Sequence, residues 1–190
     1  MRTLTRASLL GLLGALALWA GPTRVDAQTP ICEASGVQVS VDFTSGGRHT
    51  CRVADNGEII LDVTPEGQPI NPSPYYAFRL DAQQRTRLRI TLDYGEYEHR
   101  YAPKYTHDGV NWRSVPPRML VVAADEHRAT MTLNVEPGLT VVSAQPIETP
   151  AAMHAWARAT LAPHAFEQVQ YGTSIDGAPL IGIAAAKDRA

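Results

Sequence analysis

Residues 70–112, INPSPYYAFRLDAQQRTRLRITLDYGEYEHRYAPKYTHDGVNW, form the stretch that decides the fold. Apolar side chains alternate with polar ones in two segments of it, first at Tyr76, Phe78 and Leu80 and then at Leu88, Ile90 and Leu92. This alternation predicts two half-buried strands. A third strand is expected over residues 99–105, before a tight turn at Asp108-Gly109. We therefore expect an antiparallel meander, and the stretch contains no complete catalytic constellation.

Short segments with similar alternation continue on both sides of this stretch. They are residues 37–43, 50–53 and 58–63 before it, and residues 119–123, 130–135 and 139–144 after it. Turn residues such as Asp55-Asn56-Gly57 separate them. Short strands at regular spacing predict an all-β fold, an antiparallel β-sandwich that occupies residues 28–148.

The character of the sequence changes at Thr149. Thr149 can cap a helix, Pro150 suits its first turn, and Pro163 ends it. Two extended segments follow, over residues 166–171 and 180–185. Residues 149–190 are therefore expected to form one helix and a terminal β-hairpin.

The first 27 residues have the three parts of a secretory signal peptide. Arg2 and Arg6 precede an apolar run over residues 7–20, and small or compact residues lead up to Ala27. This order predicts cleavage between Ala27 and Gln28, and a secreted or periplasmic location. A membrane helix is the rival interpretation, but the run is shorter than the roughly 20 residues that span a bilayer. We expect no membrane attachment after cleavage.

Cys32 and Cys51 are the only cysteines in the chain. In an oxidising compartment an even pair usually forms a bridge, so these two residues are the disulfide candidates. Two separate buried thiols are the alternative. A zinc site is not expected, because two lone cysteines lack the paired spacing of a zinc knuckle.

The charge balance excludes one class of partner. The whole chain has 17 basic and 19 acidic residues, and removal of residues 1–27 takes three arginines and one aspartate with it. The 14 basic and 18 acidic residues that remain give a formal charge of −4. This acidic balance excludes a basic footprint for nucleic acid, so no nucleic-acid partner is expected.

Several motifs carry a resemblance to a known family. NPSPYYAF over residues 71–78, HRYAP over 99–103 and DGVNW over 108–112 resemble the amino-terminal β-sandwich of cytosolic-carboxypeptidase-like zinc metallocarboxypeptidases. Residues 171–180, YGTSIDGAPL, are similar to the hairpin that opens the catalytic domain of that family. That hairpin is typically Gly-x-Ser-x-x-Gly followed by a basic residue, so Ala178 departs from the pattern. Together these motifs cover most of the chain after Gly36.

The resemblance implies what the intact protein does. Members remove carboxy-terminal residues from peptides, with a zinc ion held by a His-x-x-Glu pair and a distant histidine, and with a glutamate as general base. In the family these elements lie downstream of the opening hairpin. We therefore expect no catalytic residue, metal ligand or cofactor in this chain, and no activity of the chain alone. Its expected role is to dock on a carboxypeptidase catalytic domain and to shape the access of peptide substrates.

One pair of residues matches part of the zinc motif. His164 and Glu167 have the His-x-x-Glu spacing, but they stand before the hairpin, and a zinc site needs a third protein ligand. We interpret the pair as part of a surface loop. His99, His107 and His127 are likewise interpreted as solvated or singly hydrogen-bonded side chains.

Two sets of side chains keep an alternative function open. An aromatic platform for a peptide or glycan can be drawn from Tyr75, Tyr76, Tyr101, Tyr105 and Trp112, although aromatic residues on strands more often pack in the sheet or core. Arg85, Arg87 and Arg89 predict a solvated face or a docking surface for an acidic partner. The alternative is a stand-alone envelope module that binds glycan or peptide.

Overall fold

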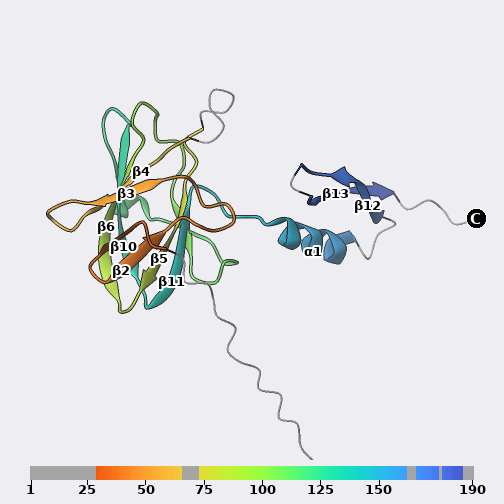
Figure 1. Cartoon of the computed structure of the whole chain (residues 1–190), viewed down its shortest axis with the longest axis horizontal. Helices are drawn as coiled ribbons and strands as arrows, with labels where there is room; N and C mark the ends of the chain where they lie inside the picture. Colours follow the sequence, from red (N-terminus) through yellow and green to blue (C-terminus); the bar gives the residue numbers. More distant parts are fainter. Residues whose placement is uncertain (1–28, 66–72, 162–165, 176, 186–190) are drawn as a thin grey trace, which may run out of the picture.

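The computed structural model describes residues 29–65, 73–161, 166–175 and 177–185. Two sheets pack face to face as a sandwich, and a helix and a two-stranded sheet follow it along the chain (Figure 1). One sheet has the order β1 (Cys32–Ala34), β2 (Val37–Ser40), β5 (Ala77–Ala82), β11 (Gly138–Ser143), β7 (Lys104–Thr106) and β8 (Arg113–Ser114). The other has the order β3 (Thr50–Val53), β4 (Ile59–Asp62), β6 (Thr86–Asp93), β10 (Arg128–Val135) and β9 (Leu120–Val122).

The remaining elements are short. A 3₁₀ helix, η1 (Pro117–Met119), leads into β9. The last part of the described chain contains α1 (Pro150–Leu161), β12 (Phe166–Thr173) and β13 (Pro179–Ala185). The all-β sandwich, the single helix after it and the terminal hairpin are confirmed. No helix among the described residues is long and apolar enough to cross a membrane.

The core lies between the two sheets, and period-2 alternation builds it. In β6 and β10 the buried side chains face one another in register, with Ile90 opposite Met131 and Leu88 opposite Leu133. The opposite sheet supplies Phe78 and other apolar residues from β2 and β5. Burying one such side chain contributes roughly 1.5–3 kcal/mol, which is why the alternation fixes the face that each strand turns inward.

The predicted meander is wrong. β5 pairs with β2 and β11, whereas β6 pairs with β10 and β4, so the two central strands lie in opposite sheets. The three residues 83–85 carry the chain across the core instead of turning it within one sheet. The third expected strand is shorter than residues 99–105, because β7 begins only at Lys104.

Among the described strands, one pair runs parallel and the others pair antiparallel. β4 and β6 are parallel neighbours, with Ile59 beside Ile90 and Leu61 beside Leu92. Parallel neighbours need a crossover connection, and β5 supplies it by lying in the other sheet. The chain therefore leaves the five-stranded sheet after β4 and returns to it as β6.

A disulfide joins the two sheets at one side. Cys32 lies in β1 and Cys51 in β3, which are the end strands of their respective sheets. The two residues are bonded, with their α-carbons 5.7 Å apart. The predicted pairing is therefore present, and it holds together two sheet edges that no continuous strand connects.

A buried histidine packs beside the crossing between β2 and β3. His49 is 4% exposed, and its Nδ1 accepts a hydrogen bond from the backbone N–H of Thr64 at 3.3 Å. Its Nε2 has no partner among the described residues. Gly47 lies against the ring so closely that a Cβ there would be 1.9 Å from Nε2. Only glycine fits this position without displacing the imidazole.

Candidate functional site

The helix α1 begins where its sequence predicts. The hydroxyl of Thr149 accepts a hydrogen bond from the backbone N–H of Ala152 at 3.1 Å, and the carbonyl of Thr149 accepts one from Met153 at 2.9 Å. Pro150 occupies the first turn, where no amide hydrogen is needed. The cap fixes the start of α1 a few residues after β11, the last strand of the sandwich.

The turn between β12 and β13 explains part of the GTSIDG motif. The Ser174 hydroxyl accepts a hydrogen bond from the Ala178 N–H at 3.1 Å, and the Ser174 N–H donates to the Ala178 carbonyl at 2.7 Å. Gly177 has a φ of +81°, a conformation that favours glycine. The serine and the second glycine of this motif therefore shape the turn.

The terminal unit, defined here as α1, β12 and β13, has almost no core of its own. Ala157 is the only buried residue of α1, and no described residue of β12 or β13 is buried. One side-chain hydrogen bond joins helix and hairpin, from Gln168 Nε2 to the His154 carbonyl at 3.2 Å. Most of its large apolar side chains are exposed, namely Met153, Trp156, Phe166, Tyr171, Leu180 and Ile183, and so is Ile175 in the turn between β12 and β13.

The sandwich differs sharply from the terminal unit in this respect. Its exposed large apolar residues are five scattered positions among the described residues, Val53, Val110, Val121, Val122 and Leu139. Trp156 and Tyr171, by contrast, are 58% and 69% exposed within a much shorter segment. Concentrated apolar exposure marks an interaction surface, whereas isolated apolar residues are normal on any protein.

The described residues do not provide a site for the zinc ion that the resemblance implies. His164 lies outside the described residues, and Glu167 lies exposed in β12. Within the described ranges no group of three or more His, Cys, Asp or Glu side chains is placed to hold a metal ion. No catalytic step through zinc is therefore assigned to this chain.

The other three candidate histidines each form a hydrogen bond with a nearby group of the fold. Nδ1 of His99 pairs with the Tyr94 hydroxyl at 2.8 Å, and Nδ1 of His107 pairs with the Thr140 hydroxyl at 3.0 Å. Nδ1 of His127 donates to the Tyr97 carbonyl at 2.9 Å. Burial lowers the pKa of His99, against an opposing influence of Glu126. His99 and His127 lie on neighbouring segments, since the His99 N–H donates to the Glu126 carbonyl, but the described residues include no cluster of three or more possible metal ligands.

The aromatic residues belong mainly to the core, so they do not form an open platform. Tyr76 is fully buried, its hydroxyl donates to the Tyr101 carbonyl at 3.0 Å, and its pKa is raised by burial. Tyr75, Tyr101 and Tyr105 are partly buried against the same cluster. Trp112 is the exception, because it lines an open hollow near the end of the sandwich.

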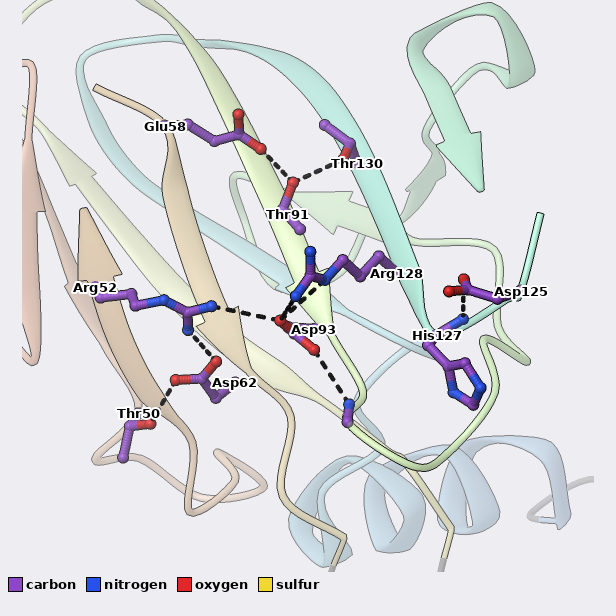
Figure 2. Close-up of polar contacts among 11 residues, drawn as sticks. Thr50, Arg52, Glu58, Asp62, Thr91, Asp93, Asp125, His127, Arg128 and Thr130 are labelled. Carbon is purple, nitrogen blue, oxygen red and sulfur yellow. Dashed lines mark hydrogen bonds and ion pairs between the residues drawn. The ribbon is translucent and has the colours of Figure 1, made fainter. Parts of the chain in front are cut away.

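Figure 2 shows a charged network on the outer face of the five-stranded sheet. Oδ2 of Asp93 accepts hydrogen bonds from Nε of Arg128 at 3.1 Å and from Arg52 at 3.4 Å, and Arg52 also pairs with Asp62. Partial burial raises the pKa of Asp93, but the Gly95 N–H and the Arg128 charge outweigh it, so the pKa lies below its usual value. The network links β3, β4, β6 and β10 across the sheet.

A second carboxylate belongs to the same face. Glu58 accepts hydrogen bonds from the Thr91 hydroxyl and from Nε of Arg89, the latter at 2.9 Å. These bonds outweigh its partial burial and lower its pKa. A hollow of about 290 Å³ lies between these groups, but the charged side chains that line it already bind one another. This face is therefore a structural network, since a ligand would have to displace existing ion pairs.

The three arginines of the predicted docking face have different roles. Arg89 pairs with Glu58. Arg85 pairs with Glu136 through Nε at 2.9 Å, which joins the β5–β6 link to the β10–β11 link. Arg87 is exposed opposite Asn134. Exposed ion pairs of this kind stabilise a fold by about 0–1 kcal/mol each. The sequence identified the charged residues, but not their partners, because the partners come from distant strands.

No protein-family model matches the sequence, and no curated protein matches it significantly. Solved structures do match. The fold resembles part of a metallo-carboxypeptidase. The metallo-carboxypeptidase from Burkholderia cenocepacia is 16% identical with a TM-score of 0.61, and the match covers 77% of this chain and 39% of that chain.

Two further bacterial structures agree with that match. The putative carboxypeptidase A from Shewanella denitrificans is 13% identical with a TM-score of 0.63, and the match covers 80% of this chain and 40% of that one. The metallo-carboxypeptidase from Pseudomonas aeruginosa is 18% identical with a TM-score of 0.58 and coverages of 80% and 41%. The chain therefore spans about two fifths of the length of these proteins. At such low identity the likeness shows the fold, and the activity of the whole proteins is not carried over.

Proposed function

We propose that this chain is the non-catalytic amino-terminal part of an exported zinc metallocarboxypeptidase of the cytosolic-carboxypeptidase-like type. In this proposal the terminal unit docks on a peptidase domain, either in the same polypeptide or in a separate one. The fold likeness to bacterial metallo-carboxypeptidases supports the family. The signal-peptide pattern and the disulfide support export.

The terminal unit without a core is the observation that carries the docking role. A two-stranded sheet is marginally stable in water unless its apolar face is covered. None of the described residues of β12 or β13 is buried, and Trp156, Tyr171 and Leu180 are all more than half exposed. A partner surface that covers these side chains would complete the unit. The peptidase domain is the proposed partner, and the fold likeness to part of longer carboxypeptidases supports this choice.

The alternative of an aromatic-platform module receives less support. Such a platform needs several aromatic faces open to solvent on one surface. Tyr76 lies in the core, and the neighbouring tyrosines pack against it. The exposed aromatic side chains of the terminal unit instead occur together with exposed aliphatic ones, a composition typical of protein interfaces.

The first test of the proposal is the nucleotide sequence that follows and surrounds this coding region. We expect the sequence encoded after Ala190, or a polypeptide encoded beside it, to contain a His-x-x-Glu pair, a distant histidine and a glutamate base. Amide hydrogen exchange then compares the isolated chain with the chain joined to that domain. We expect residues 166–185 to exchange rapidly in isolation, because their hydrogen bonds lie in an uncovered hairpin, and to become protected when the domain is present.

A matched pair of variants assigns that protection to the apolar surface. Trp156→Ser with Leu180→Ser should abolish it, while Val110→Ser with Val121→Ser, which changes exposed valines of the sandwich, should leave it intact. Protection of β12 and β13 in the isolated chain equal to that of β6 and β10 would contradict the proposal. So would a neighbouring gene sequence with no peptidase domain.

A further inference from the structure

An open hollow of about 680 Å³ lies where the β7–β8 loop meets the segment between β11 and α1. Asp108, Asn111, Trp112 and Arg113 line it from the loop side, and Pro146 and Glu148 line it from the other. The hollow belongs to the sandwich and is separate from the exposed apolar residues of the terminal unit.

Three of the side chains that line this hollow have no polar partner in the described part of the fold. The indole N–H of Trp112, the guanidinium of Arg113 and the carboxylate of Glu148 form no hydrogen bond or ion pair with any described residue. The charged network of Figure 2 is the opposite case, because its arginines and carboxylates bind one another. An aromatic ring, a cation and an anion that share a hollow without internal partners remain available to a ligand.

The loop that leads to Trp112 and Arg113 is ordered by hydrogen bonds to Asp108. The carboxylate of Asp108 accepts hydrogen bonds from the backbone N–H groups of Val110 and Asn111, at 2.9 and 2.7 Å, and from the Thr106 hydroxyl at 2.9 Å. The Asn111 backbone and side chain contribute most to holding the pKa of Asp108 well below its usual value. A loop ordered in advance loses little conformational entropy when it binds a ligand.

We propose that this hollow binds an extended peptide that carries both an acidic and a basic group. Arg113 pairs with the carboxylate of the peptide, Glu148 pairs with its basic group, and the Trp112 ring covers an apolar side chain between them. Arg113 belongs to β8, the end strand of its sheet, whose outer edge has no neighbouring strand in the described chain. A free strand edge offers backbone hydrogen bonds that suit a peptide better than a sugar. This proposal does not depend on docking of the terminal unit.

Tryptophan fluorescence gives a direct test with the exported chain, residues 28–190. That chain contains only Trp112 and Trp156, so Trp156→Phe leaves Trp112 as the sole reporter. The probes are acetyl-Lys-Thr-Leu-Thr-Glu-amide, the peptide of reversed order, and acetyl-Gln-Thr-Leu-Thr-Gln-amide. We expect a saturable change in Trp112 emission. Of the two charged peptides, the one whose order suits the hollow should bind about tenfold more tightly than the neutral peptide.

Charge variants make the assignment specific. Arg113→Gln and Glu148→Gln should each weaken binding of the charged peptide about tenfold and leave binding of the neutral peptide unchanged. Arg118→Gln, which removes an exposed arginine of η1 outside the hollow, should change neither. Absence of saturation up to millimolar peptide would overturn the proposal. Equal affinity for all three peptides, or an Arg113→Gln variant that still prefers the charged peptide, would overturn it as well.

Discussion

The double variant Cys32→Ala, Cys51→Ala should unfold with a free energy about 3 kcal/mol smaller than that of the parent chain. The bond closes a loop with a sequence separation of 19, and it joins the end strands of the two sheets. Its loss increases the conformational entropy of the denatured chain and removes the covalent link between β1 and β3, so that β1 keeps its pairing with β2 and its packing in the core. Urea unfolding at neutral pH, followed by far-ultraviolet circular dichroism, measures the difference.

Reductant provides the matched control for this prediction. It should shift the parent's urea midpoint toward that of the double variant, and it should have no effect on the double variant itself. Identical midpoints for the parent with and without reductant would show that the bridge does not contribute to stability.

A second large effect is expected from acid. Burial lowers the pKa of His49 to about 4, from 6.5 in the unfolded chain. Because the folded-state pKa is the lower one, the unfolded chain takes up the proton first as pH falls. Stability is therefore complete above pH 6.5 and is lost as pH falls toward 4. A shift of this size corresponds to about 3 kcal/mol across that window.

The structure explains why protonation opposes folding. Nδ1 of His49 accepts a hydrogen bond from Thr64, so a proton on Nδ1 would break it, and the charge would be buried beside Gly47. Urea midpoints measured from pH 7 to pH 4.5 should fall steeply for the parent and much less for His49→Gln. His107→Gln, at an exposed histidine, should keep the parent's slope. The decisive quantity is the slope, because His49→Gln also changes packing; equal slopes for the parent and His49→Gln would contradict the prediction.

The sequence predicts where the strands are better than it predicts which strands pair with one another. Alternation identifies β6 and β10, because a buried face every second residue is a local pattern. It does not identify which strands pair, since a three-residue link such as residues 83–85 can turn within a sheet or cross between sheets. That ambiguity produced the wrong meander, and it also concealed the parallel pairing of β4 with β6.

The candidate sites show the same division between local and distant information. The cap at Thr149 and the turn at Ser174 are local, and both can be read from the sequence. The network around Asp93 and the hollow beside Trp112 depend on residues far apart in the chain, such as Arg113 and Glu148. The exposure of Trp156 could not be predicted either, because helical spacing identifies an apolar residue without showing what covers it.

A peptidase assay of the isolated chain tests most directly the central claim that this part is non-catalytic. Residues 28–190 are purified, given one equivalent of zinc, and incubated with peptides that have free carboxyl termini. Mass spectrometry then measures the residues released. Because a zinc peptidase needs three protein ligands, an open coordination position and a placed base, we expect no release above that of zinc without protein. Zinc-dependent release by the chain would contradict the claim, and its loss in His164→Ala would assign the activity to His164 and Glu167.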